Sequence, residues 1–203
     1  MHAHSAGMQD PQGAWPDPHA TPRQPRLWRP LLVFVVVTAL LQYGWKQSRD
    51  TAVERAVIHV ATVQTSVALI HGLTPEVGAQ AQGSRIRAPG GGINILNGCE
   101  GTDALFLLVA AMLAHRATWR QRALGLLAGT AAVFALNQVR VLVLFYSYRH
   151  DRTLFDSLHG LVTPLVLICA AVALFAVWAH WVDGARRSQA QAAEGANPGG
   201  AGL

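Results

Sequence analysis

Residues 123–146 read ALGLLAGTAAVFALNQVRVLVLFY, an apolar run with a single charged residue, Arg140. A helix that crosses a bilayer needs about 20 consecutive apolar residues, and this run is long enough. A second apolar run, 102–117, lies just before it. Between the two runs lie three arginines: Arg116, Arg120 and Arg122. Such a short link predicts an antiparallel pair of membrane helices.

The composition of the whole chain also favours a membrane protein. Of the 203 residues, 51% are hydrophobic and only 13% are charged, whereas soluble domains carry about 25% charged residues. So much apolar surface is hard to bury in one core of this size, which disfavours a soluble globular enzyme. The net charge is +5, but the basic residues are scattered, so nucleic-acid binding is not expected.

We predict an all-α integral membrane protein with one membrane domain at 27–184. Its four transmembrane helices are expected at about 28–46, 101–117, 122–147 and 158–182. The last contains a proline, Pro164, which bends a membrane helix without forbidding it. A signal peptide is the competing interpretation of the first span, because arginines precede it. A clear small-x-small cleavage site is lacking, which favours a retained anchor.

The two ends of the chain lack hydrophobic periodicity. Residues 1–26 contain five prolines, and residues 185–203 (ARRSQAQAAEGANPGGAGL) are low in complexity. Such segments cannot bury enough apolar surface to fold on their own. We therefore expect a disordered leader and a disordered tail.

The segment between the first two spans is of mixed character. Within 51–71, apolar residues recur at helical spacing: Ala56, Val60, Val63, Val67 and Ile70. This stripe predicts an amphipathic helix on the membrane surface or against the bundle. Residues 85–87 and 93–95 alternate on either side of Pro89-Gly90-Gly91-Gly92, as in a small hairpin or an extended loop. Both features are expected on the outer side.

Two cysteines, Cys99 and Cys169, are too few for a disulfide scaffold or a thiolate metal site, and no metal or cofactor is expected. Cys99 stands just before a predicted helix, whose N-terminal N–H groups would stabilise a thiolate. A lone cysteine in a membrane helix is usually a small hydrophobe, and Cys169 is given that role. The neighbours of Cys99 are instead polar and flexible: Asn97, Gly98, Glu100 and Gly101. Glu100 and nearby Asp103 are expected to be solvated caps.

Arg140 is the second candidate, because a centred arginine costs about 2.5–3.5 kcal/mol on insertion scales and usually faces a polar partner. Snorkelling is the alternative, since the helix end near Ser147 is only about 10 Å away. Asn137, one turn earlier on the same face, favours a polar site. His159 begins the last span on the same membrane side as Cys99 and Arg140. A thiol, an acid or base and a fixed cation are the components of cysteine nucleophilic catalysis.

Three motifs in this order resemble the exosortase/archaeosortase family of integral membrane proteins. They are NGCEGTDALFLLVAAML at 97–113, NQVRVLVLFY at 137–146 and SLHG at 157–160, and the resemblance covers roughly 93–178. Many relatives carry more N-terminal spans than the single one predicted here. The resemblance implies a Cys–Arg–His active site, which maps onto Cys99, Arg140 and His159.

The resemblance also implies substrates with a C-terminal PEP-CTERM-like signal, which consists of a short motif, a hydrophobic helix and a basic end. The expected protein is a cysteine transpeptidase or protease of the bacterial inner membrane. Its partners would be membrane-anchored proteins with a C-terminal sorting helix, together with the lipid bilayer. The arginines of the 116–122 loop outnumber Arg149 and Arg152, which favours a cytosolic N-terminus and a periplasmic active site. The alternative is a non-catalytic assembly partner of an export or exopolysaccharide machine.

Overall fold

In the part of the chain that the structure describes, four helices are long and apolar enough to cross a membrane. The computed structural model describes residues 28–95 and 99–195. The helices occupy Trp28–Gln47, Ala52–Leu73, Trp119–His150 and Arg152–Ala193. The predicted all-α membrane fold is thus confirmed, and the leader 1–26 lies outside the described residues.

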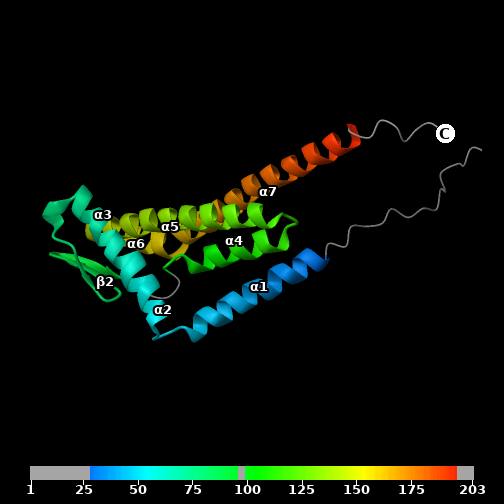
Figure 1. Cartoon of the computed structure of the whole chain (residues 1–203). Helices are drawn as coiled ribbons and strands as arrows, with labels where there is room; N and C mark the ends of the chain where they lie inside the picture. Colours follow the sequence, from blue (N-terminus) through cyan, green and yellow to red (C-terminus); the bar gives the residue numbers. More distant parts are fainter. Residues whose placement is uncertain (1–27, 96–98, 196–203) are drawn as a thin grey trace, which may run out of the picture.

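The elements follow one another in a simple order (Figure 1). Helix α1 (Trp28–Gln47) precedes a continuous helix made of α2 (Ala52–Arg55), the π-helical η1 (Ala56–Gln64) and α3 (Thr65–Leu73). After the short η2 (Pro75–Val77) come β1 (Gln80–Gln82), β2 (Arg85–Ala88) and β3 (Gly91–Asn94). The remaining helices are α4 (Thr102–Ala114), α5 (Trp119–His150), α6 (Arg152–Ser157), the π-helical η3 (Leu158–Val162) and α7 (Thr163–Gly195).

The set of long helices differs from the predicted spans in two helices. Helix α4 has 13 residues, or about 20 Å, and is shorter than a full span. The helix at Ala52–Leu73 has 22 residues and qualifies by length and apolarity, although the sequence predicts an amphipathic helix there, on the membrane surface or against the bundle. Figure 1 shows it crossing one end of the bundle at a steep angle to α4 and α5. This orientation agrees with a helix that caps the bundle.

Helix α4 is the central helix, in contact with α1, α5 and α7. Glycines of α5 allow this close packing: a Cβ on Gly129 would lie 2.8 Å from Leu108 of α4, and one on Gly125 would overlap the Trp178 indole of α7. The indole Nε1 donates to the carbonyl of Gln121 at 3.1 Å. The bundle interior is therefore closed by small residues of α5 that face larger ones of its neighbours.

A second core lies at the end of the bundle that carries the sheet. The three strands are antiparallel in the order β1–β2–β3, so the hairpin alternative predicted for 85–95 is confirmed, with β1 as an additional strand. Ile86 and Ile93 of the sheet pack with Ile70 of α3 and Phe145 of α5. Because α5 has 32 residues, its C-terminal part extends beyond the bundle. It supports the sheet and the helix at Ala52–Leu73, which together form the cap of the bundle.

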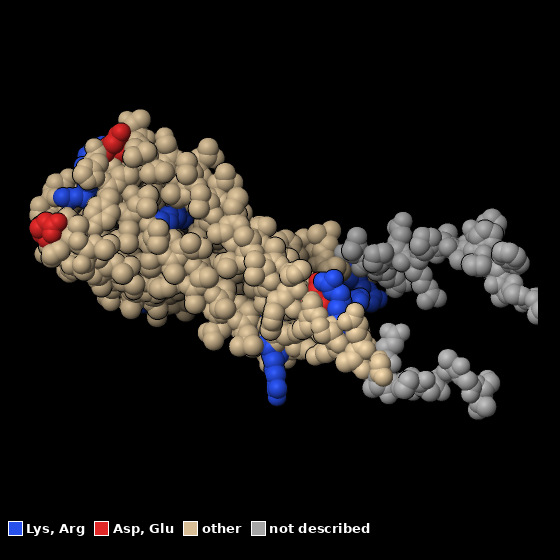
Figure 2. Space-filling model, turned by 90° about the horizontal axis from the view of Figure 1, so that it is seen from above, with Lys and Arg blue, Asp and Glu red and all other residues tan. Residues whose placement is uncertain are grey.

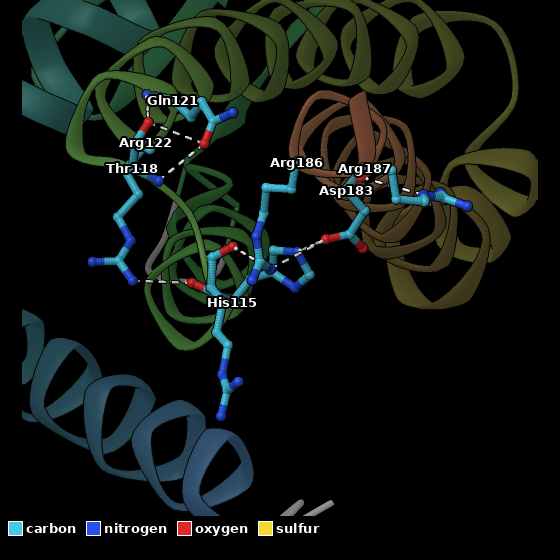
Figure 3. Close-up of polar contacts among 8 residues, drawn as sticks. His115, Thr118, Gln121, Arg122, Asp183, Arg186 and Arg187 are labelled. Atoms are coloured by element: carbon cyan, nitrogen blue, oxygen red, sulfur yellow. Dashed lines mark hydrogen bonds and ion pairs between the residues drawn. The ribbon is translucent and has the colours of Figure 1, made fainter. Parts of the chain in front are cut away.

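The opposite end is held by a polar cluster that links three elements (Figure 3). Nε2 of His115, just after α4, lies 3.2 Å from Oδ1 of Asp183 on α7. Arg122 of α5 donates to the carbonyl of His115 at 3.0 Å. Thr118 and Gln121 form a capping box that starts α5. The short arginine-rich loop is thereby fastened to α7.

Helix α7 continues to Gly195, so the predicted disorder of 185–203 is wrong for residues 185–195. The reason lies in their composition: Ala, Gln and Arg have high helix propensity, and they extend a helix that is already nucleated. Residues 196–203 lie outside the described part.

The surface is divided as a bilayer requires. On the face drawn in Figure 2, charged side chains are few and most of them lie towards the two ends of the molecule, whereas the part between them is mostly uncharged. Large apolar side chains are exposed on the bundle, among them Leu31, Leu40, Leu127 and Val172. Lipid accepts such surface, whereas water would not.

Candidate active site

Cys99 lies between the sheet and the start of α4 in the chain, beside the core at the sheet end. Its Sγ is 3.9 Å from Nδ1 of His159, which is a long sulfur–nitrogen contact. The thiol is half-buried and packs against the core of the cap. Nucleophile–base contacts are often this loose before substrate binds. The thiol and the imidazole are thus adjacent although 60 residues separate them in sequence.

His159 lies in the π-helical turn η3, within an otherwise α-helical segment. Pro164 has no backbone N–H, so the carbonyl of Gly160, four residues earlier, loses its usual partner. In the same turn, the N–H of Thr163 bonds to the carbonyl of Leu158, five residues back, which is the hydrogen-bond spacing of a π-helix. The imidazole is stacked on the Phe155 ring, with centroids 5.3 Å apart and an interplanar angle of 6°. Stacking and the wide turn together orient the ring towards Cys99.

Arg140 is buried, with 7% of its surface exposed. Its Nε donates to Oγ1 of Thr163 at 3.1 Å, and Thr163 Oγ1 donates to the carbonyl of Leu158 at 2.9 Å. This arrangement disfavours the snorkelling interpretation, because the side chain is turned into the protein. The guanidinium is anchored to the same π-helical turn that carries His159.

The structure therefore connects the three predicted site residues through two contacts. Cys99 meets His159 directly, and Arg140 reaches the turn of His159 through Thr163. Thr163 was not singled out from the sequence, although its position four residues after His159 places it on the same helix face.

Glu100 does not have the solvated role that the sequence predicts. It is 7% exposed, and its Oε1 accepts from Nε1 of Trp45 and from Oγ1 of Thr102, each at 2.9 Å. Trp45 belongs to α1, so this contact fastens α1 to the residue that follows the candidate nucleophile. The correction has a physical cause: a helix distant in sequence covers the carboxylate. Asp103, by contrast, is exposed, as expected for a cap.

Two adjacent buried amides of α5 differ in their hydrogen bonding. Gln138 accepts from Ser66 Oγ at 2.6 Å and donates to the carbonyl of Ala61 at 3.2 Å. Asn137 is 1% exposed, yet both of its amide atoms lack a partner among the described residues. Its amide lies against Gly101, where a Cβ would be 2.9 Å from Cγ and Oδ1. Gly101 also has a φ of +80°, so both the lack of space for a Cβ and the backbone conformation require glycine there.

Within 28–95 and 99–195, no group of three or more His, Cys, Asp or Glu side chains is arranged to hold a metal ion. Cys169 is an exposed residue of α7, away from the candidate site. Asn97 and Gly98, which the sequence analysis placed around the thiol, lie outside the described residues. The candidate groups that the described part brings together are the thiol of Cys99, the imidazole of His159 and the guanidinium of Arg140.

Comparison with known proteins gives one finding. A family model described as transmembrane exosortase matches residues 19–176, a stretch that includes all three candidate residues and covers well over half of the chain. No curated protein and no solved structure gave a match.

Proposed function

This chain belongs to the transmembrane exosortase family, and we propose that it is a cysteine transpeptidase or protease. Its proposed substrates are membrane-anchored proteins with a C-terminal PEP-CTERM-like sorting signal. The observation that carries the proposal is the 3.9 Å contact of Cys99 Sγ with His159 Nδ1, beside a buried arginine that is anchored to the same turn.

In the proposed reaction, the Cys99 thiolate attacks the carbonyl carbon of the scissile peptide bond. A C–S bond forms, and the electron pair of the C=O bond moves to the oxygen. When this pair returns, the C–N bond breaks, and protonated His159 supplies a proton to the leaving amine. A thioester on Cys99 remains, and water, an amine or a hydroxyl then resolves it.

Arg140 is proposed to stabilise the oxyanion of the tetrahedral intermediate. A guanidinium has several N–H donors in one plane, and the bond from Nε to Thr163 fixes the orientation of that plane. Donors held in place before the reaction stabilise developing charge without reorganisation. Burial strengthens this effect, because the local dielectric constant is low.

The dimensions of α5 support a site at the outer edge of the bilayer. Trp119 and Arg140 are separated by roughly 31 Å of helix, at 1.5 Å per residue, which is close to the thickness of the hydrocarbon core. Trp45 contacts Glu100, the residue after Cys99, and tryptophan favours membrane interfaces. We propose that this side is the periplasmic face of the bacterial inner membrane, where sorting signals would be presented.

The test is the fate of a C-terminally tagged candidate substrate in cells that carry Cys99→Ser or the unchanged protein. We expect Cys99→Ser to abolish processing at equal membrane levels. Hydroxylamine should release an acyl group from the unchanged protein and none from Cys99→Ala, because a thioester is cleaved by this reagent. Normal processing by Cys99→Ser would contradict catalysis and support the assembly-partner alternative.

A further inference from the structure

Asn137 is a buried amide whose hydrogen-bonding capacity is not used by the described protein. With 1% of its surface exposed and both amide atoms unpartnered among the described residues, it destabilises the folded state. A leucine of similar shape would avoid this cost. A buried polar group without a partner calls for an explanation, and one such explanation is a ligand that binds there.

The adjacent Gln138 shows that the local fold can satisfy a buried amide. Its two groups bond to Ser66 and to the carbonyl of Ala61 in the helix at Ala52–Leu73. This amide fastens the cap to α5 and has a structural role. Asn137 points to a different side of α5, where no such bonds are made, and its role must differ.

The surroundings of Asn137 place it at the candidate site. Its amide lies against Gly101, which is the N-cap of α4 and comes two residues after Cys99. It is also three residues before Arg140, so the two side chains are neighbours on one face of α5. The unpartnered amide thus lies between the backbone at the nucleophile and the proposed oxyanion-binding cation.

We propose that Asn137 is a second oxyanion donor, which acts together with Arg140 when a carbonyl compound reacts at Cys99. The inference rests on the proposed function, because it concerns the same acyl-transfer step. Nδ2 donates to the carbonyl oxygen of the substrate, and this bond strengthens as negative charge develops on the oxygen. The occupant that satisfies the amide is therefore the scissile carbonyl group.

Two small probes of Cys99 separate this role from a structural one. p-Nitrophenyl acetate acylates a thiolate: a C–S bond forms through an oxyanion, the C–O bond breaks, and p-nitrophenolate leaves with the electron pair. Methyl methanethiosulfonate forms a disulfide, with methanesulfinate as the leaving group, and no oxyanion arises. The ratio of the two rates reports oxyanion stabilisation and is independent of how accessible the thiol is to both reagents.

The experiment uses the full chain in detergent with Cys169→Ala, so that Cys99 is the single thiol. We expect Asn137→Leu to slow acylation roughly a hundredfold, the size typical for loss of one such donor, and to leave disulfide formation near the parent rate. Asn137→Asp keeps the shape without the donor and should slow acylation similarly. The Tm of Asn137→Leu should be equal to or above that of the parent.

Gln138→Leu is the matched control, a buried amide on the same helix. It should lower the Tm, because Ser66 and Ala61 lose a partner, and leave the ratio of rates unchanged. Two results would overturn this inference but not the proposed function. One is an unchanged ratio of acylation to disulfide formation in Asn137→Leu, and the other is a fall in its Tm as large as that of Gln138→Leu, with both rates reduced. A parent protein that is not acylated at Cys99 would overturn the proposed function, and the inference with it.

Discussion

Arg140 of α5 and Thr163 of α7 are joined by a hydrogen bond of 3.1 Å from the guanidinium Nε to the threonine Oγ1. The same hydroxyl donates to the carbonyl of Leu158 at 2.9 Å, in the π-helical turn that contains His159. One side chain therefore sets the position of two proposed catalytic groups. Thr163 is a positioning residue in this scheme, because it acts through its neighbours.

Replacing Thr163 should separate positioning from packing. Thr163→Val keeps the shape but removes the hydroxyl, and we expect processing to fall about tenfold or more, since misplacement by about 1 Å costs up to a hundredfold. Thr163→Ser keeps the hydroxyl and should restore most of the rate. Processing assays at matched membrane levels give the measurement. Equal activity of the valine and serine variants would show that the hydroxyl has no positioning role.

The two cysteines should differ in chemical reactivity. Cys99 stands at the start of α4 and beside His159, a setting in which the thiolate is stabilised. Cys169 is an exposed residue of the apolar part of α7. We expect iodoacetamide to alkylate Cys99 faster at every pH from 6 to 9, with the largest ratio at the acidic end, as read by mass spectrometry of single-cysteine variants. Equal rates across this range would remove the argument for an activated thiol.

Length and apolarity are local properties, and they were enough to predict long apolar helices near 28–46, 122–147 and 158–182 and the hairpin before Cys99. The π-helical turn was not predicted, because it depends on the two bonds from the N–H and the hydroxyl of Thr163 to the carbonyl of Leu158. The burial of Glu100 was not predicted either. An acidic residue at a helix start is usually solvated, and only the packing of α1 on α4 shows that Trp45 covers it.

The candidate site was predictable as a set of residues, but its connections were not. The topology alone indicated that Cys99, Arg140 and His159 belong to one end of the bundle. The role of Thr163 as the link and the unpartnered state of Asn137 depend on side-chain packing between helices that are distant in sequence. Such packing follows no sequence period, so no pattern could reveal it.

Glu100 should matter more for stability than its neighbour Asp103. Glu100→Ala leaves the Trp45 indole N–H and the Thr102 hydroxyl without their acceptor, and an unpaired buried donor costs about 1–3 kcal/mol. Asp103 is exposed, so Asp103→Ala should change the Tm little. Thermal unfolding of both variants in detergent is the measurement. A Tm for Glu100→Ala at or above that of Asp103→Ala would show that the buried contacts are not stabilising.

The orientation in the membrane can be tested with introduced cysteines. In a chain with Cys99→Ser and Cys169→Ala, Gln82→Cys marks the sheet and Gln189→Cys marks the end of α7; both positions are exposed, and neither change alters the charge. We expect a membrane-impermeant maleimide to label Gln82→Cys in intact spheroplasts and Gln189→Cys only after lysis, since the arginines of the 116–122 loop favour the cytosol. The reverse pattern would place the candidate site in the cytosol.

Arg140→Lys should fail almost as badly as Arg140→Ala, although it keeps the positive charge. An oxyanion donor must lie about 3 Å from an oxygen that is charged only during the reaction. The lysine ammonium is compact, strongly hydrated and carried on a different stem, so it cannot reproduce the planar fork of the guanidinium. It also lacks the Nε–H that Thr163 accepts. Loss of one such donor costs roughly 3–4 kcal/mol, a hundred- to thousandfold in rate.

The control for this change is the thermal stability of Arg140→Lys, together with His159→Ala as a variant that affects proton transfer instead. If Arg140 were only a positional charge that anchors α5 to α7, lysine would support near-normal processing, and the alanine variant would lose activity in proportion to its loss of folded protein. Substrate processing at matched membrane levels distinguishes the two roles. Near-normal processing by Arg140→Lys would reject the oxyanion role, whereas a severe loss with an unchanged Tm requires the geometry of the guanidinium and not its charge alone.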